Sequence, residues 1–205
     1  MARMSDSVTA WDTQKLVCQL IDKTLVVANK YQDTYRTQTI RASWHNYDGG
    51  IYFITICTKN YRHYFGEIAH HVMNLSSIGK CAKECLDAIP NHFPHVEIPL
   101  SVVMPNHIHC ILVIKDPHLE KKTISSMRPH NEFGPQSMNL ASVIRGFKIG
   151  VKKYAIKAGL EFDWQPRYYD HIIRNLNDWN RIATYIENNV GRWDQDKLNI
   201  DADLM

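Results

Sequence analysis

The chain has 205 residues, of which 44% are hydrophobic and 22% are charged, and its formal net charge is +3. This composition is typical of a globular domain that buries a core, and the small positive charge is compatible with a polyanionic partner without identifying one. No signal peptide, lipidation motif or long apolar run is visible, so we expect no membrane partner. The five cysteines form no CxxC pair, so we expect reduced thiols in a cytoplasmic protein.

The beginning of the chain is expected to extend a single domain. Residues 1–40 carry apolar side chains at the spacing of an amphipathic helix and then become polar, so we expect a docking helix or a partly ordered tail. The domain itself is predicted for residues 41–205. Aromatic and β-branched residues predict its first strand at 51–58. Apolar residues at helical spacing predict a helix at about 75–90, ended by Pro90.

Two further strands are predicted, and the second of them carries a pair of histidines. The first is expected at 96–103 with a break at Pro99, and the other within residues 104–114. Because side chains alternate along a strand, His107 and His109 should lie on one face. Imidazole is the commonest nitrogen ligand of divalent ions, so the pair predicts a metal site. The alternative is two core histidines, each of which needs its own polar partners.

A polar segment separates the histidine strand from a long helix. Residues 115–137 contain several prolines and a glycine, so we expect either a functional lid or a disordered loop. The apolar spacing then predicts a helix at 140–158. Arg145, Lys148 and Lys152 fall on a stripe beside its apolar face. Such a stripe is either an ordinary solvated face or a track for phosphates.

The last third of the chain combines stacking groups with a tyrosine beside an apolar helix face. Residues 163–175 are rich in aromatic, amide and arginine side chains, which bind nucleic acids but also occur in ordinary cores, and they include a predicted strand at 169–174. Asn177 is predicted to cap a final helix. Tyr185 lies off the apolar stripe of that helix, and Asn189 follows one turn later on the same flank, which favours a pocket.

These motifs together resemble a known family of nucleases. Residues 104–109, MPNHIH, resemble the His-hydrophobic-His motif of the HUH single-strand nucleases. The fuller pattern over residues 44–196 is similar to the IS200-like, REP-associated tyrosine transposases. The other matching segments are YFIT at 52–55, WQPRYYDHIIRN at 164–175 and the pair Tyr185-Ile186. The resemblance implies a ferredoxin-like α+β fold, an antiparallel sheet with packed helices, in which the tyrosine helix crosses the face bearing the histidines.

The activity implied by this resemblance is metal-dependent cleavage of single-stranded DNA by transesterification. Tyr185 would attack the scissile phosphorus, form a 5′-phosphotyrosine and release a 3′-OH, so that the strand can later be rejoined. A phenol has a pKa of about 10 and is a weak nucleophile at neutral pH. A Mg²⁺ or Mn²⁺ ion held by His107 and His109 would polarise the phosphate, and Asn189 matches the position of a third ligand.

The partner implied by the resemblance is a hairpin-forming repeat end, in a bacterial, nucleoid-associated protein. Seven residues are expected to contact this DNA, the first three through phosphates and the others near the active site: Arg145, Lys148, Lys152, Trp164, Gln165, Arg167 and Arg174. Trp164 and Gln165 have a structural alternative, in which they buttress the sheet. Members of the wider group act as dimers or as monomers, so a homodimer is one of two expected states.

Two other functions are compatible with the same pattern. The long 115–137 segment leaves room for a non-catalytic hairpin-binding regulator, and so does Asn189-Val190, where the family often has Asn-Pro. A replication initiator or relaxase of the same superfamily is disfavoured by the single candidate tyrosine and the short chain. The C-terminal tail, with Asp194 and Asp196, is expected to be peripheral.

Overall fold

The computed structural model describes residue 47, residues 49–115 and residues 139–199. The predicted N-terminal extension and nearly all of the segment predicted as a lid or disordered loop lie outside the described residues. Within the described part of the chain, no helix is long and apolar enough to cross a membrane.

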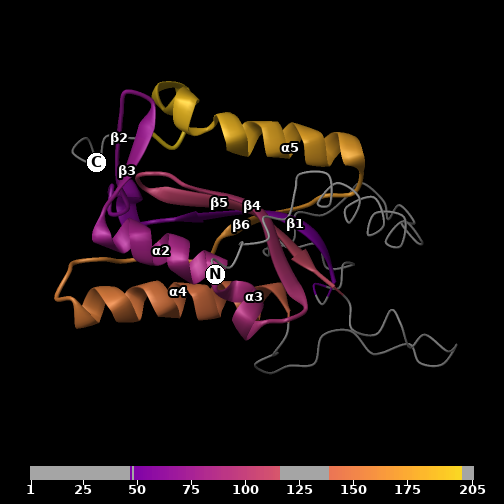
Figure 1. Ribbon diagram of the computed structural model, residues 1–205, viewed down its shortest axis with the longest axis horizontal. Coiled ribbons are helices and arrows are strands. Elements are labelled where there is room, and N and C mark those ends of the chain that lie inside the picture. The colour runs from indigo at the N-terminus through magenta and orange to yellow at the C-terminus, as the bar shows by residue number, and fades with distance from the viewer. Residues whose placement is uncertain (1–46, 48, 116–138, 200–205) are drawn as a thin grey trace, which may run out of the picture.

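A four-stranded antiparallel sheet forms the centre of the molecule, with the strand order β4-β5-β1-β6 (Figure 1). Its strands are β1 (Gly50–Cys57), β4 (Val96–Val103), β5 (His107–Ile114) and β6 (Tyr169–Ile172). Helix α2 (Ser77–Asp87) connects β1 to β4, and helix α4 (Leu140–Lys157) connects β5 to β6. This β-α-β-β-α-β order, with the third strand of the series beside the first, is ferredoxin-like, and it confirms the predicted α+β fold.

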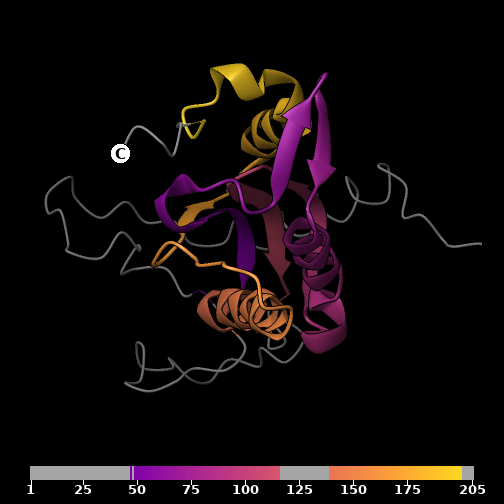
Figure 2. The same ribbon diagram turned by 90° about the vertical axis from the view of Figure 1, so that its left-hand side faces the viewer.

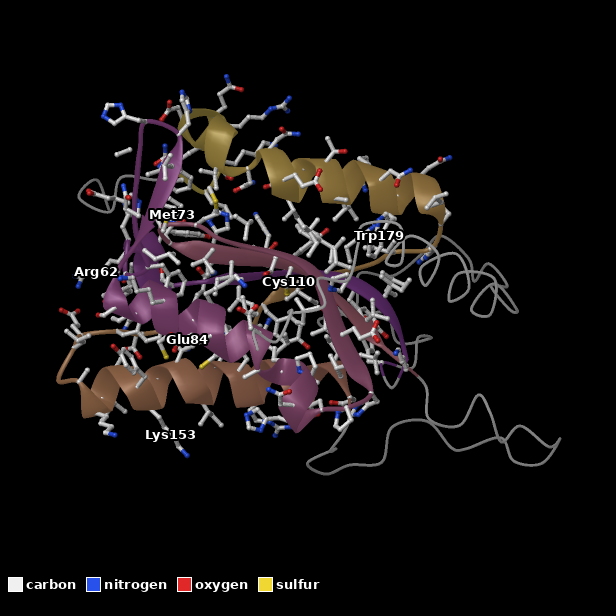
Figure 3. All side chains as sticks on the ribbon, in the orientation of Figure 1. Arg62, Met73, Glu84, Cys110, Lys153 and Trp179 are labelled. Atoms are coloured by element: carbon white, nitrogen blue, oxygen red, sulfur yellow. The ribbon has the colours of Figure 1, made fainter. Side chains whose placement is uncertain are left out.

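Helices cover both faces of the sheet. Helices α2 and α4 pack on one face, and α5 (Leu176–Asn188) lies across the other, which gives three layers (Figures 1 and 2). Figure 3 shows Trp179 of α5 between this helix and the sheet, whereas Lys153 of α4 points away from it. The four-stranded sheet is therefore sandwiched, and α5 is an addition to the ferredoxin-like core.

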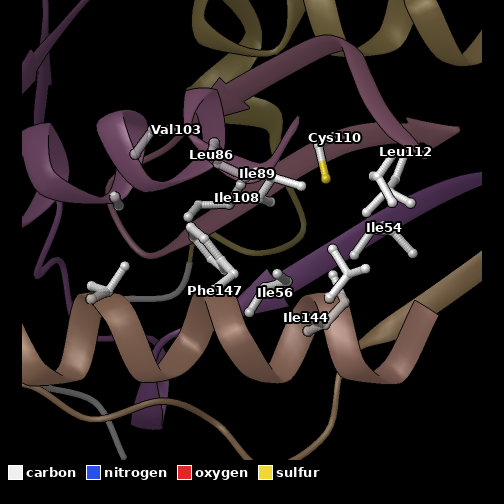
Figure 4. Packing of buried hydrophobic residues seen from close by; sticks show 14 of the residues in the cluster. Ile54, Ile56, Leu86, Ile89, Val103, Ile108, Cys110, Leu112, Ile144 and Phe147 are labelled. Carbon is white, nitrogen blue, oxygen red and sulfur yellow. The ribbon is translucent and has the colours of Figure 1, made fainter. Parts of the chain in front are cut away.

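The strand periodicity decides which residues face which helix layer. On β5, Ile108 and Leu112 belong to the larger apolar core under α2 and α4, together with Ile56 of β1 and Phe147 of α4 (Figure 4). The alternate side chains of β5 face α5, where Ile111 packs in a second, smaller core. A register slip by one residue would exchange these two sets of side chains. The apolar pattern therefore fixes the face on which the histidines lie.

The two prolines that were predicted to interrupt a helix and a strand do so only in part. The helix predicted at 75–90 is two helices, because α3 (Ile89–His92) follows α2 and takes Pro90 into its first turn, where a missing N–H costs little. Strand β4 is continuous across Pro99, with a register shift between Glu97 and Leu100. It tolerates the proline because it lies at the edge of the sheet.

Four short elements were not predicted, and one helix cap was predicted wrongly. Strands β2 (Gly66–Ala69) and β3 (Val72–Leu75) form a separate hairpin, and two 3-10 segments are η1 (Lys59–Tyr61) and η3 (Val190–Gln195). Their short lengths leave little periodicity to detect. Helix α5 is capped by Asn175 rather than Asn177, since Asn175 Oδ1 accepts a hydrogen bond from the Asp178 N–H at 2.8 Å.

Two helical glycines are expected to respond oppositely to alanine. A Cβ at Gly79 of α2 would clash with the carbonyl oxygen of Phe65, which accepts a hydrogen bond from the Ser76 N–H, whereas a Cβ at Gly146 of α4 would meet Phe93 at an ordinary 3.6 Å. We expect Gly79→Ala to lower the free energy of unfolding by about 1–3 kcal/mol, as overpacking does. Gly146→Ala should raise it by up to about 1 kcal/mol through helix propensity. Urea unfolding of both variants is the test, and equal shifts would contradict the predicted clash.

Candidate active site

The two histidines of β5 lie under α5, side by side and buried. His107 is 0% exposed and His109 is 2% exposed, and their ring centroids are 4.5 Å apart. Both were expected on one face of a strand, and the structure places them there, on the side of the sheet that α5 covers. Burial at this depth requires that each ring nitrogen has a partner or a bound group.

Asn106 determines which nitrogen of His107 carries the proton. The Asn106 side-chain N–H donates to the carbonyl oxygen of Leu198 at 2.7 Å, so its Oδ1 faces His107 Nδ1, also at 2.7 Å. An amide oxygen only accepts, so Nδ1 is the protonated nitrogen and Nε2 presents its lone pair. Burial lowers the pKa of His107, and the nearby Asp196 side chain raises it by less, which leaves a pKa of about 4. The ring is therefore neutral at pH 7. Nε2 is buried and has no hydrogen-bond partner among the described residues.

His109 connects the sheet to the tyrosine of α5. Its Nδ1 lies 2.9 Å from Thr55 Oγ1 of β1, and its Nε2 lies 3.2 Å from the Tyr185 hydroxyl. Burial, with the neighbouring His107, lowers the pKa of His109 well below its usual value. His109 is therefore neutral as well, and its Nε2 points to the same space as that of His107.

Tyr185 stands at the edge of this space and reaches solvent. It is 44% exposed, as its position off the apolar stripe of α5 predicted. Partial burial raises the pKa of its hydroxyl, and the Asp196 carboxylate raises it further, while hydrogen bonding with the Asn189 side chain acts in the opposite direction. Because a phenolate is disfavoured here, a cation near the hydroxyl would be needed to stabilise one.

Asp196 belongs to the site, which corrects the expectation that it is peripheral. Its side chain is only 6% exposed, and its Oδ2 lies 3.9 Å from His107 Nε2. The Leu198 N–H donates to the other carboxylate oxygen at 2.8 Å. Segment η3 brings Asp196 to the sheet because Trp193 is buried with its ring centroid 6.0 Å from that of His107. The Asp196 side chain and the Nε2 atom of His107 thus face each other across 3.9 Å.

The donor atoms around this space fit a divalent cation. One nitrogen of each histidine and a carboxylate oxygen of Asp196 lie within 4.8 Å of one another. Asn189 is 3% exposed, and its Oδ1 is a second buried polar atom without a partner in the described part of the chain. Two imidazoles, a carboxylate and an amide oxygen form a mixed set that suits Mn²⁺ and tolerates Mg²⁺. These residues could therefore hold the ion implied by the sequence.

A large cleft opens beside the histidines and Tyr185. Its volume is about 1220 Å³, and its wall includes residues of β1, β6, α5, η3 and the segment before β6. Gln165 and Arg167, two of the predicted DNA contacts, line this cleft. Arg174 is exposed just after β6 and is not among the lining residues. The cleft is large enough to admit a nucleotide, and Tyr185 lines it.

The basic stripe of α4 lies in the opposite helix layer. Arg145, Lys148 and Lys152 line a shallow groove of about 400 Å³, which shares Arg167 and Tyr168 with the cleft. Two of the lysines are engaged within the protein: Lys148 Nζ donates to the Gln165 carbonyl at 2.8 Å and also to that of Arg167, and Lys152 pairs with Asp163 at 2.7 Å. These contacts brace the segment that leads to β6.

Trp164 is partly buried against the larger core and lines the α4 groove, but it does not line the cleft. Its ring lies 4.9 Å from that of Phe162 and 5.6 Å from that of Phe65, measured between centroids. Its indole N–H donates to the carbonyl oxygen of Lys148 at 3.0 Å. This is the placement described by the structural alternative, in which Trp164 supports the sheet and α4.

Replacing Asn106 should weaken ion binding although it is no ligand. Asn106→Ala removes the acceptor that holds the proton on His107 Nδ1, and we expect affinity for Mn²⁺ to fall by about 10–100-fold, as for other residues that orient a metal ligand. Asn106→Asp keeps an acceptor at Nδ1 and should retain more of the affinity. Calorimetric Mn²⁺ titration of both variants is the measurement. Equal, undiminished affinities would show that the orientation of His107 does not depend on Asn106.

Some known proteins are similar to this chain in sequence or in structure. No protein-family model matches the sequence. Two solved structures are similar to it: the REP-associated tyrosine transposase bound to a REP hairpin, at 24% identity over 79% of this chain and 74% of that chain with a TM-score of 0.48, and a candidate transposase from Deinococcus radiodurans R1, at 15% identity over 73% and 97% with a TM-score of 0.42.

One relative is an uncharacterised protein from Haemophilus influenzae (strain ATCC 51907 / DSM 11121 / KW20 / Rd). It is 39% identical over 172 residues, which cover 82% of this chain and 95% of that protein. The chain therefore belongs to the same protein family as this Haemophilus influenzae protein.

Proposed function

We propose that this protein is an HUH-type tyrosine transposase that cleaves and rejoins single-stranded DNA, with Tyr185 as the nucleophile. The observation that carries the proposal is the position of the Tyr185 hydroxyl, 3.2 Å from His109 Nε2 and beside a candidate ion site in which two buried polar atoms, His107 Nε2 and Asn189 Oδ1, have no hydrogen-bond partner among the described residues. The sequence motifs shared with the REP-associated tyrosine transposases support it independently. A structural role alone does not explain why two polar atoms are left unpaired at this depth.

The residues of the site divide into a nucleophile and the groups that surround the reacting phosphate. In the proposed step, the Tyr185 oxygen forms a bond to phosphorus while the bond from phosphorus to the 3′ oxygen breaks. The phenol proton passes to water in the cleft, and the released 3′ oxygen takes up a proton to become a 3′-OH. The phosphotyrosine keeps the energy of the phosphodiester, so a second 3′-OH can reverse the step on another strand.

The proposed ion ligands are His107, His109 and Asn189, with Asp196 as a fourth donor. Asn106 and Thr55 orient the two imidazoles through their Nδ1 atoms. A bound Mg²⁺ or Mn²⁺ would supply charge neutralisation at the phosphate and at the forming phenolate. Without it, the raised pKa of Tyr185 leaves the hydroxyl protonated at neutral pH.

The DNA substrate proposed is a hairpin with a single-stranded flank. The single strand would occupy the cleft next to Tyr185, which Gln165 and Arg167 line. The stem phosphates would follow the basic groove on α4, where Arg145, Lys148 and Lys152 lie. Arg167 lines both the cleft and the groove and is therefore placed at the junction between duplex and single strand. Trp164 lines the groove with these residues, whereas Arg174 lines neither the cleft nor the groove, and we assign Arg174 no direct part in this path.

A strand-cleavage assay tests the proposal. The protein is incubated with end-labelled single-stranded oligonucleotides that contain the repeat hairpins flanking its gene, with Mg²⁺, Mn²⁺ or a chelator. We expect a nicked product with a free 3′-OH and a protein-linked fragment in denaturing gels, and neither in the chelator. Tight hairpin binding without cleavage under any ion would overturn the proposal and would favour the repeat-binding regulator.

A further inference from the structure

We propose that Tyr169, whose ring packs edge-on against Phe53, forms a stacking platform for an unpaired nucleobase next to the scissile phosphate. The inference rests on the proposed function for its link to cleavage, but the platform itself requires only that single-stranded DNA enters the cleft. Neither side chain belongs to the proposed nucleophile or ion site.

Strand pairing puts these rings on the catalytic face of the sheet. Thr55 pairs with Tyr169 and Phe53 pairs with His171 in the antiparallel register between β1 and β6. Directly paired residues point to the same face, and Thr55 is the residue that contacts His109. Tyr169, Phe53 and His171 therefore share the face that bears the histidines, and all three line the cleft.

Helix α5 leaves this part of the face accessible. The helix packs chiefly on β4 and β5, which lie away from β6 in the strand order, and it contacts β6 through the pair Asp178–His171. Tyr169 is consequently 51% exposed, although it projects from a strand beside buried Thr55. A large aromatic ring that remains half exposed inside a cleft is available to contact a ligand. Aromatic rings on an open sheet face are a common means of binding single-stranded nucleic acid.

The platform is adjacent to the nucleophile. The Phe53 ring lies 5.1 Å from that of His109, 6.1 Å from that of Tyr185 and 6.4 Å from that of Tyr169, measured between centroids. Phe53 thus separates Tyr169 from Tyr185 by one ring. A base stacked on Tyr169 would hold its own phosphate close to the Tyr185 hydroxyl. Binding of this nucleotide would thereby orient the scissile bond for attack.

The charges around the cleft match a polyanion. Arg167, Arg181 and Arg192 line it and are exposed. The acidic Asp178 nearby is already paired with His171 at 2.8 Å and with Arg181. Arg167 has a positive φ of 66°, a conformation that costs a non-glycine residue about 1 kcal/mol or more, and its carbonyl is held by Lys148. Rings that stack on bases beside cations that bind phosphates favour single-stranded DNA over an apolar protein partner.

Binding of fluorescent oligonucleotides tests the platform without requiring cleavage. Hairpin oligonucleotides are prepared that carry 2-aminopurine at successive positions of the single-stranded flank. Each is titrated, in the presence of a chelator, with the Tyr185→Phe protein, which cannot cleave it by the proposed mechanism. We expect binding to quench the 2-aminopurine fluorescence at one position of the flank. Adding Tyr169→Ala should remove this quenching and weaken DNA binding by about 5-fold to 100-fold, as for loss of one stacked base. Tyr169→Phe should keep both properties. Tyr169→Leu fills the same space without an aromatic ring and should behave like the alanine variant.

Tyr154→Ala serves as the matched control, because Tyr154 is a 37% exposed tyrosine on α4 that does not line the cleft. It should leave the quench and the affinity unchanged. If Tyr169→Ala and Tyr169→Leu bind and quench as the parent does, the platform is refuted, even when the wild-type protein cleaves DNA. If the wild-type protein does not cleave but the Tyr169 variants lose the quench, the catalytic proposal fails and the stacking site remains.

Discussion

Tyr185→Phe should abolish both the nicked product and the covalent protein–DNA adduct. The substitution removes only the hydroxyl that lies 3.2 Å from His109 Nε2 and keeps the ring in place. Because the side chain is 44% exposed, the fold should tolerate the change with a loss of less than about 1 kcal/mol. Product and adduct are measured on denaturing gels and by mass spectrometry of the tryptic peptide that carries the nucleotide. Tyr154→Phe on α4 is the control and should form the adduct normally.

Two results would separate the mechanisms. An adduct that persists in Tyr185→Phe would show that another residue is the nucleophile. Nicking that persists without an adduct would instead indicate hydrolysis by water at the same ion site, and the protein would then be a nuclease without strand transfer. Hairpin binding should be retained in the variant in either case, because the hydroxyl contributes little to the surface of the cleft.

His107→Ala should reduce Mn²⁺ affinity by about 100-fold or more, and cleavage with it. The imidazole contributes a buried Nε2 lone pair that faces the Asp196 carboxylate at 3.9 Å. Residues that only orient a ligand already contribute about 10–100-fold, so loss of a ligand should cost at least as much. Isothermal titration with Mn²⁺ and the cleavage assay are the two measurements. His92→Ala, at an exposed position on α3, is the control and should leave both unchanged.

Stability must be measured alongside ion binding in this variant. His107→Ala leaves a cavity and an unpaired Asn106 Oδ1, so thermal unfolding in a chelator should show a loss of about 1–3 kcal/mol. The wild-type protein should gain stability when Mn²⁺ is added, and the variant should not, because binding to the folded state alone stabilises it. A variant that is folded and still stabilised by Mn²⁺ would show that the ion is held elsewhere.

The sequence alone was sufficient for the main elements and for the two chemical groups at the centre of the site. Alternation along β5 and the apolar stripe of α5 are local patterns. They predicted that His107 and His109 share one face and that Tyr185 lies off the packed side of its helix. Both are read from neighbours within one element, so no knowledge of the tertiary structure was needed. The ferredoxin-like order of strands and helices followed from the family resemblance, and the sheet topology agrees with it.

Only the tertiary structure decided how the site is completed. Asp196 directly follows η3, a short 3-10 segment without periodicity, and it reaches His107 because Trp193 is buried there. The proton on His107 depends on Asn106, whose orientation is set by a carbonyl 92 residues away in the sequence. Lys148 looked like part of a phosphate track, yet its ammonium group also holds two carbonyls before β6. Each of these contacts joins residues distant in sequence, and the order of residues carries no local signal of such proximity.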